Sequence, residues 1–474
     1  MVPLYLHEDR FFDPDPAIRS VARELYAATR ALPLVAPHGH VAPELLAENA
    51  PFPDPATLFI KPDHYIFRML YAQGVSMESL GVPSRDGTPV ETDPRVIWRR
   101  FAAHYYLFAG TPTRAWLDYQ LAKVFEVPVA LDADSADLVY NHLAERLTEP
   151  AFRPRALYER FGLEVLTTTD AATDDLRYHR ALRDEGWGGK VRPCFRPDAL
   201  FRIAQPEWGQ HLHALEARQE AQLGSYAAFR EALWDRRQAF KALGAFATDH
   251  AVVDPYTHRL ADADAEVLYQ RALGGTATVA DQAAFEAHLL MEMAAMSTED
   301  GLVMQLHPGS YRDHNGPVAE RFGPDMGADI PVATEYTRNL HALLNAYGNH
   351  PNLTLVLFTL DEAAYSRELA PLAGHYPALR LGPPWWFHDS IEGMLRFRQQ
   401  TSETAGLYNT AGFNDDTRAF CSIPARHDLA RRVDATFLAR LVARHQLTER
   451  EAHRLARALA YDLVRQTYRL DQEE

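Results

Sequence analysis

The chain has 474 residues, of which 47% are hydrophobic and 24% charged, a balance typical of a globular protein with a large core. Its formal net charge of −16 disfavours binding to nucleic acid or to anionic membranes, whose phosphates the protein would repel. Two cysteines exclude a disulfide framework and a four-thiolate zinc site. Because the chain also shows no signal-peptide pattern and no membrane-spanning run, we predict a cytoplasmic protein.

The first elements are a helix and a short buried strand. Asp15 is a candidate N-cap with Pro16 at the first helical position, and the helical spacing of apolar residues ends near Ala31. An apolar run then leads to His38 and His40. This pattern predicts a strand with chemically active side chains at its carboxyl end.

From residue 41 to residue 162 the sequence has helical periodicity interrupted by proline-rich connections, and no buried strand stands out. We therefore predict a large, mostly helical insertion after the first strand. At the other end of the chain, residues 425–470 are dominated by amphipathic patterns, which predict C-terminal helices packed on the outside of the core.

Between these regions, short apolar runs alternate with helical stretches. With the run before His38 there are eight: the others are Leu163 to Thr168, Lys190 to Phe195, Ala245 to Thr248, Leu302 to Leu306, Leu353 to Phe358, Leu379 to Gly382 and Ala411 to Phe413. Alternating strands and helices predict an α/β fold with parallel strands, since each parallel strand needs a crossover helix. We expect a (β/α)8 TIM-type barrel spanning residues 1–474 as one domain, with a doubly wound open sheet as the alternative.

Polar side chains follow nearly every run, and in a barrel these ends converge on one face, where active sites lie. They are His38 and His40, Thr169 and Asp170, Arg196, Asp249 and His250, His307, Asp361, Trp385 and Trp386, and Asp416 with Arg418. Residues far apart in the sequence are therefore expected to be neighbours in space.

Two of these residues point to a metal site. His38 and His40 are two positions apart on an extended chain, so both imidazoles face the same side and could bind one ion. Histidine with a carboxylate suits zinc first, with manganese and iron as alternatives. Asp416 is the preferred third ligand because the eighth strand of a closed barrel adjoins the first, and Asp415 is the alternative.

Other side chains predict further contacts. His307 is a candidate additional metal ligand, a donor to a ligand, or a structural histidine, and His250 is equally ambiguous. Arg196 and Arg418 could bind an anionic substrate through their guanidinium groups, or form ion pairs with nearby aspartates. Trp385 and Trp386 could form a flat wall for a sugar, or belong to the core.

Taken in order, several segments make the chain resemble the uronate isomerases of the metal-dependent amidohydrolase superfamily. These segments are His38-Gly-His40, Asp63-His64-Tyr65 with Arg68, Phe195-Arg196-Pro197-Asp198, Asp249-His250, Met304-Gln305-Leu306-His307, Gly323-Pro324-Asp325, Trp385-Trp386-Phe387 with Asp389, and Asp416-Thr417-Arg418 with Arg426-His427. The resemblance implies one divalent metal on His38, His40 and Asp416. It also implies that His64, Tyr65, Arg196 and Arg418 contact the substrate, and that the helical insertion covers the barrel mouth.

The activity implied by the resemblance is the interconversion of an aldehyde-form hexuronate, glucuronate or galacturonate, and its 2-keto isomer. We expect Asp416 to take the carbon proton, His64 or Tyr65 to handle the oxygen protons, and Arg418 to face the developing negative charge. Arg196 would hold the C6 carboxylate. A superfamily hydrolase that uses metal-activated water is the main alternative, and a non-catalytic carbohydrate-binding protein is another. We expect no nucleic-acid or membrane partner, and assembly as a homo-oligomer.

Overall fold

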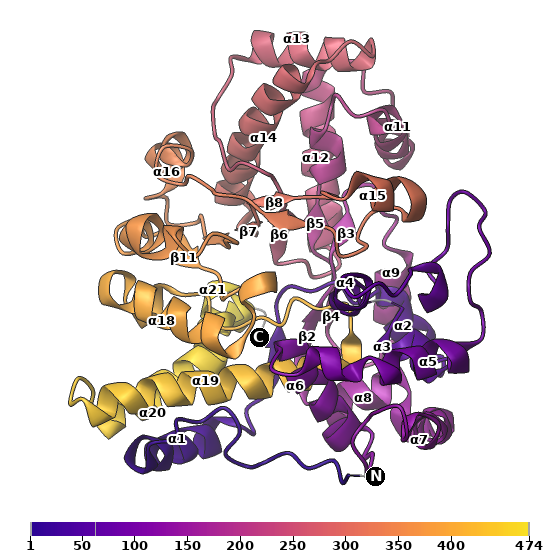
Figure 1. Cartoon of the computed structure of the whole chain (residues 1–474). Helices are drawn as coiled ribbons and strands as arrows, with labels where there is room; N and C mark the ends of the chain where they lie inside the picture. The colour runs from indigo at the N-terminus through magenta and orange to yellow at the C-terminus, as the bar shows by residue number, and fades with distance from the viewer. Residues whose placement is uncertain (1, 62, 473–474) are drawn as a thin grey trace.

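The computed structural model describes residues 2–61 and 63–472. Short strands lie in the middle of the molecule, with helices on all sides of them (Figure 1). In chain order the strands are β1 (Leu34–Ala36), β2 (Leu163–Thr167), β3 (Asp170–Ala171), β4 (Val191–Arg192), β5 (Phe195–Arg196), β6 (Ala247–His250), β7 (Val303–Leu306), β8 (Ser310–Tyr311), β9 (Ile330–Pro331), β10 (Leu355–Leu357) and β11 (Leu379–Leu381).

The main strands pair in parallel. The sheets have the orders β1-β2-β4 and β11-β10-β7-β6-β5-β3, and β8 pairs antiparallel with β9 on its own. Strand β3 continues β2 after a short break, and β5 continues β4 in the same way. Each of these two chain segments therefore has one part in each parallel sheet. Pro193 lies in the second break, where it has no N–H to donate to a ladder. Backbone hydrogen bonds from Thr168 to Arg192 and from Asp170 to Cys194, each 3.0 Å, carry the pairing across it.

The predicted strand order is therefore confirmed for seven of the runs, and the eighth run is different. Ala411 to Phe413 is not a strand: its contribution is an isolated parallel bridge between Leu381 and Thr410. Gly412 has φ +81°, and a Cβ there would lie 2.4 Å from Val464 Cγ2, so a close-packed helix bends the chain at this point. Within the described residues no ladder joins this segment to β1, and a 3.0 Å hydrogen bond from His40 N–H to the Thr417 carbonyl links the two.

Residues 41–162 are helical in the structure. Their helices are α2 (Pro43–Glu48), α3 (Pro55–Phe59), α4 (His64–Tyr71), α5 (Pro94–Ala103), α6 (Pro112–Tyr119), α7 (Ala136–Thr148) and α8 (Pro154–Arg160). Proline at the first position recurs because this ring presets the helical φ where no N–H partner is needed. Their apolar faces share a core built around Trp98, Phe101 and Phe125.

The remaining helices flank the strands and form both ends of the molecule. Helix α1 (Pro16–Thr29) is capped by Asp15 as predicted. The others are α9 (Arg177–Glu185), α10 (Asp198–Phe201), α11 (Trp208–Gln219), α12 (Tyr226–Lys241), α13 (Asp262–Leu273), α14 (Val279–Asp300), α15 (Gly316–Phe322), α16 (His341–Tyr347), α17 (Ala370–Ala373), α18 (Ile391–Ala405), α19 (Ile423–Ala443), α20 (Glu449–Arg457) and α21 (Leu463–Thr467). Shorter 3-10 and π turns occupy Glu78–Leu80, Tyr105–Phe108, Gln120–Val124, Pro150–Phe152, Tyr365–Leu369, Trp386–His388, Leu407–Asn409, Phe420–Ser422, Ala458–Asp462 and Leu470–Gln472.

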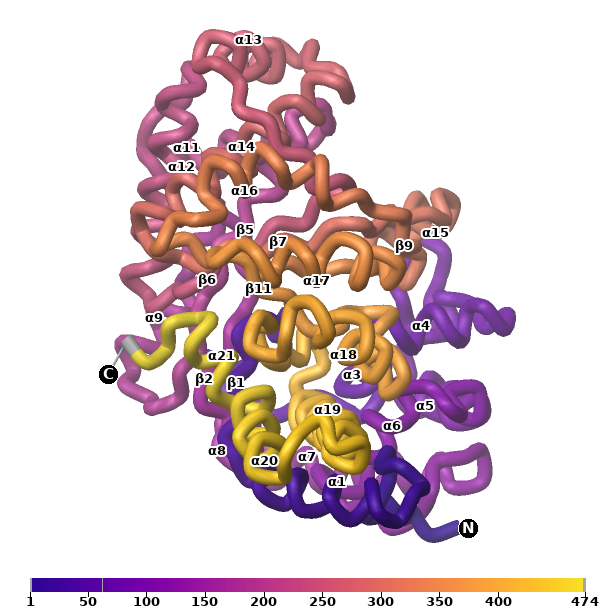
Figure 2. The backbone as a smooth tube through the Cα atoms, turned by 90° about the vertical axis from the view of Figure 1, so that its left-hand side faces the viewer, coloured from indigo at the N-terminus to yellow at the C-terminus, as the bar shows by residue number. Residues whose placement is uncertain are grey.

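The C-terminal helices are more deeply buried than their sequence suggested. Figure 2 shows α1, α19 and α20 together at the end of the molecule opposite α13. Helix α19 is buried along nearly its whole length because α1, α6, α18 and α20 pack around it, so it does not present an exposed polar face to solvent. None of the helices in residues 2–61 and 63–472 combines the length and the apolar character that crossing a membrane requires.

Candidate active site and metal-binding group

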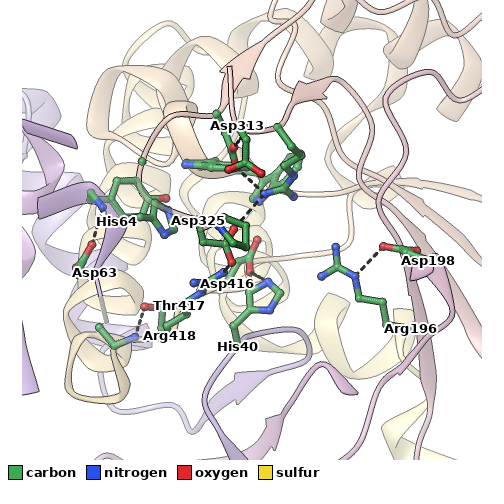
Figure 3. Close-up of a pocket in the computed structure, with 18 of the residues that line it drawn as sticks. His40, Asp63, His64, Arg196, Asp198, Asp313, Asp325, Asp416, Thr417 and Arg418 are labelled. Atoms are coloured by element: carbon green, nitrogen blue, oxygen red, sulfur yellow. Dashed lines mark hydrogen bonds and ion pairs between the residues drawn. The ribbon is translucent and has the colours of Figure 1, made fainter. Parts of the chain in front are cut away.

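Side chains from several separate segments meet at the carboxyl ends of the strands. A cavity of about 410 Å³ is lined there by His40 after β1, by Arg196 in β5, by Trp385 and Trp386 after β11, and by Asp416 and Arg418 after the Thr410 bridge. Helix α4 of the insertion adds His64 (Figure 3) and, beside it, Tyr65. Six of the residues that the sequence placed at strand ends therefore line one cavity, whereas Asp170, His250 and Asp361 are absent from its described lining.

Two imidazoles and one carboxylate form the tightest cluster. Nε2 of His40 lies 3.2 Å from Oδ1 of Asp416, and Nε2 of His38 lies 3.4 Å from the same oxygen. Such separations fit ligand atoms that share one ion at bonds of about 2.1 Å. His38 is 1% exposed, so this cluster is closed to bulk water on one side.

His307 completes the group from the end of β7. Its ring stacks on that of His38 with 4.6 Å between centroids. His38, His307 and Asp416 each offer a ligand atom within 4.8 Å of the others, which makes them a group that could hold a metal ion. His40 joins this group through its contact with Asp416.

The hydrogen bonding of His307 leaves one ring nitrogen ready to bind an ion. Nδ1 lies 2.7 Å from Oδ1 of Asp249, and this contact fixes the ring so that Nε2 carries the lone pair. Among the described residues, His307 Nε2 and Asp416 Oδ1 are buried with no hydrogen-bond partner. Buried polar atoms without partners are costly, and a bound cation would satisfy both. The donor set therefore fits a divalent metal.

Ionisation in the cluster also fits a cation. Burial lowers the pKa of His40 and that of His307, which keeps these imidazoles in the neutral form that metals bind. Burial acts against ionisation of Asp416, but His38 and His40 hold the pKa of its carboxyl well below the usual range. Burial likewise opposes a charge on His38, yet the Asp416 carboxylate raises the pKa of that imidazole.

The cavity's arginines are mostly engaged by carboxylates. Arg196 places Nε 2.7 Å from Oδ2 of Asp198 and Nη1 3.4 Å from Oδ2 of Asp249. Arg418 donates from Nη2 to Oδ2 of Asp325 at 2.7 Å. Both arginines lie where the sequence predicted a substrate contact, and both also have the aspartate partners that were the alternative.

Helix α4 brings in side chains that follow no strand. Asp63 caps the helix by accepting the backbone N–H of Tyr65 at 2.8 Å, which directs His64 and Tyr65 toward the cavity. Burial, aided by Arg418, lowers the pKa of His64 to about 3, and burial raises the pKa of Tyr65. Both side chains are therefore neutral at physiological pH.

The tryptophan pair forms one wall. Trp385 is 7% exposed and meets the His307 ring edge-on at 4.8 Å, so it belongs partly to the core. Trp386 is more open, and the Arg312 guanidinium lies 4.9 Å from its ring centroid. Trp386 and Asp416 have φ of 54° and 38°, which non-glycine residues rarely adopt and which is typical of functional sites.

Comparisons with known proteins identify the family. A family model described as glucuronate isomerase matches residues 11–468. The chain belongs to the glucuronate isomerase family.

Full-length relatives of this family support the same assignment. A curated uronate isomerase of Mesorhizobium japonicum is 55% identical over 462 residues, which is 98% of each chain. The crystal structure of glucuronate isomerase from Caulobacter crescentus is 51% identical with a TM-score of 0.97, and the match covers 99% of this chain and 98% of that one. The uronate isomerase structure from Thermotoga maritima is 26% identical with a TM-score of 0.91, covering 98% and 99%.

Membership of the glucuronate isomerase family confirms the predicted resemblance, the α/β fold class and the enzyme class, an aldose–ketose isomerase. The hydrolase alternative is not favoured, because the family model and the relatives that are more than half identical to this chain are isomerases.

The structure of the site decides two questions that the sequence left open. One is whether Asp415 or Asp416 faces the two histidines, and the other is whether His250 belongs to the metal-binding group. Asp415 turns away from the imidazoles of His38 and His40, and its Oδ2 lies 3.2 Å from Nε2 of His427. His250 is fully buried, with Nε2 3.0 Å from the Thr248 hydroxyl, and does not belong to the metal-binding group found among the described residues.

Other lining residues were not singled out as site residues from sequence. Asp198 and Asp325 were quoted only within family segments, and Arg426 likewise. Arg312 and Asp313 lie on the excursion between β8 and β9, and Arg202 lies just after α10. No strand run ends immediately before these positions, so periodicity carried no signal for them.

Asp170, a strand-end candidate, is instead a buried structural carboxyl. It is 6% exposed and accepts hydrogen bonds from the Thr168 hydroxyl at 2.6 Å and the Cys194 N–H at 3.3 Å. Burial raises its pKa to about 7. It is absent from the described residues that line the cavity.

This buried carboxyl predicts a pH dependence of stability. Because the folded pKa is about 7 and an unfolded aspartate titrates near 3.9, only the unfolded chain loses this proton between pH ~4 and ~7. The free energy of unfolding should therefore fall as pH rises through that window, by on the order of 2–4 kcal/mol. Asp170→Asn should remove the part of this fall that Asp170 contributes, measured as denaturant midpoints from pH 4.5 to 8.

Asp184→Asn, at an exposed position of α9, is the matched control and should keep the pH profile of the unsubstituted protein. An Asp170→Asn profile identical to that of the unsubstituted protein would contradict the raised pKa.

Proposed function

We propose that the protein is a uronate isomerase that interconverts an aldehyde-form hexuronate, glucuronate or galacturonate, and the corresponding 2-keto acid. The family assignment supports this reaction class. The observation that carries the proposal is the cluster of His38, His40 and Asp416 at a cavity that also holds arginines from separate segments.

We propose that His38, His40 and Asp416 hold one divalent metal, with His307 as a further ligand. Zinc is the first candidate because imidazole and carboxylate ligands suit it, and manganese or iron are alternatives. When bound, the metal supplies Lewis-acid polarisation of the substrate oxygens at C1 or C2. Asp249 would act on His307 by holding its ring orientation.

The chain's own residues would move the protons. Isomerisation transfers a proton from C2 to C1 and readjusts the protons on the two oxygens. Oδ1 of Asp416 faces both imidazoles, which leaves Oδ2 as the atom to take the carbon proton. This division would let one carboxylate act both as ligand and as base.

The oxygen protons would pass through helix α4. Tyr65 keeps its phenolic proton at neutral pH and can donate it, while neutral His64 can accept one. His64 Nε2 is buried with no hydrogen-bond partner among the described residues, so it is free to bond a substrate hydroxyl. Arg418 would place a fixed positive charge beside the developing oxyanion.

We propose that the chain is one domain in which residues 41–162 form a subdomain over the barrel mouth. Support comes from α4, which lines the cavity together with residues from the strand ends. Trp386 would face the sugar, and Trp385 would back it from the core. The cytoplasmic location and the homo-oligomeric state remain predictions; the two cysteines are free and buried, which agrees with a reducing compartment.

The test is turnover of a hexuronate panel by metal-replete protein in deuterium oxide, followed by proton NMR. An isomerase should give the 2-keto acid with deuterium at C1, because solvent exchange accompanies the proton transfer. Protein that forms no ketose from any hexuronate would overturn the proposal.

A further inference from the structure

Two cavities share part of their lining, including two arginines. The active-site cavity, about 410 Å³, adjoins a second cavity of about 530 Å³ whose lining includes His307. Ala199, Arg202 and Arg312 line both. A ligand in the active-site cavity would therefore have Arg202 on its wall.

Arg202 differs from the other arginines of the active-site cavity in having no carboxylate partner. Four of them form ion pairs: Arg196 with Asp198 and Asp249, Arg312 with Asp329, Arg418 with Asp325, and Arg426 with Asp389. Within residues 2–61 and 63–472, the Arg202 side chain makes neither an ion pair nor a hydrogen bond. It is the one arginine among the described lining residues without a direct carboxylate contact, and the Asp198 and Glu286 carboxyls act on it only through space.

The surroundings of Arg202 keep that charge available. The chain places it directly after α10, where the helix Asp198–Phe201 ends, and its side chain is only partly exposed. Glu286 of α14 lines the second cavity near it and has no ion pair of its own among the described residues. Because burial raises the pKa of Glu286 to about 7, that carboxyl is only partly ionised at neutral pH.

An unpaired guanidinium at the wall of a cavity is a ready partner for a carboxylate, which it can bind through two parallel hydrogen bonds. Arg196, which the sequence suggested for this task, already donates from Nε to Asp198 (Figure 3). Its Nη1 also lies 3.4 Å from Oδ2 of Asp249. Arg196 pairs with Asp249, and Asp249 in turn orients His307. Arg196 therefore fits the role of positioning the metal-binding group better than that of binding the substrate.

We infer that Arg202 binds the substrate carboxylate and makes the site selective for an acid sugar over a neutral aldose. This inference rests on the proposed isomerase function and adds to it the residue that recognises the acid. Arg196 then acts through Asp249, while Arg202 acts on the substrate directly.

The test compares Arg202→Gln with the unsubstituted protein on a hexuronate and on its C6 amide, which has the same shape without the charge. Loss of a charge-assisted pair should raise the KM for the hexuronate about 10- to 100-fold, with a smaller change in kcat. The KM for the amide should stay within about twofold. Arg202→Lys keeps a point charge and should recover part of the hexuronate affinity.

Arg218→Gln, on the exposed face of α11, is the matched control and should leave both KM values unchanged. An unchanged hexuronate KM in Arg202→Gln, or an equal rise for the amide, overturns the inference. Absence of hexuronate turnover in the unsubstituted protein would instead overturn the proposed function, so the two failures are distinct.

Discussion

Asp416→Asn is expected to lower kcat on a hexuronate by about 1,000-fold or more while the protein remains folded. The substitution removes the candidate base for the carbon proton, an effect worth about 10²- to 10⁴-fold. It also removes a charged oxygen that contacts His38 and His40. Asparagine has nearly the same shape and tolerates the left-handed φ of 38° found here, so the backbone need not move.

Steady-state kinetics and metal content measured on the same Asp416→Asn sample separate the two roles. Loss of turnover with full metal content would assign Asp416 mainly as the base, whereas loss of both would assign it mainly as a ligand. Asp313→Asn is the matched control, because Asp313 also lines the cavity with a left-handed φ, of 52°, but lies outside the metal-binding group. It should change kcat by less than about tenfold. Near-normal activity in Asp416→Asn would remove this residue from the mechanism.

Sequence periodicity located the strands well where they are buried on both faces. The prediction placed the runs Leu302 to Leu306 and Leu379 to Gly382 within one residue of β7 and β11, and every residue of β7 is buried, as expected for a parallel strand covered by helices. It failed at Ala411 to Phe413, where Gly412 bends the chain against Val464 from a helix some fifty residues later. That constraint is tertiary, so no local pattern could reveal it.

The candidate site likewise contains residues that the sequence could predict and residues that it could not. His38 and His40 could be predicted because period-two geometry is local, and Asp416 because barrel order places the last strand beside the first. His64 and Tyr65 came only from family resemblance, since they begin a helix rather than end a strand.

Which arginines are already paired could not be predicted at all. The Asp325 partner of Arg418 lies 93 residues away in the sequence, and the Asp249 partner of Arg196 comes from a different strand. Ion pairing depends on side-chain geometry in three dimensions, which is why the sequence favoured Arg196 and overlooked the unpaired Arg202.

His38→Asn is expected to reduce metal affinity by more than about 100-fold and to reduce activity in proportion. Losing a residue that merely orients a ligand costs about 10- to 100-fold in affinity, so losing a ligand itself should cost more. His38 stacks on His307 and faces Asp416, and its 1% exposure leaves little room for water to replace the lost nitrogen. Metal titration with a fluorescent competitor chelator measures the affinity directly, and added metal should restore part of the activity.

His250→Asn is the control for His38→Asn. Both histidines are buried at strand ends, His38 shortly after β1 and His250 as the last residue of β6, but His250 bonds Thr248 and stacks on Phe201 instead of facing Asp416. Its replacement should lower the unfolding midpoint without changing metal affinity. Equal loss of metal in both variants would mean that any disturbance of the strand ends releases the ion. That result would not support the metal-binding group around Asp416 as the binding site of the ion.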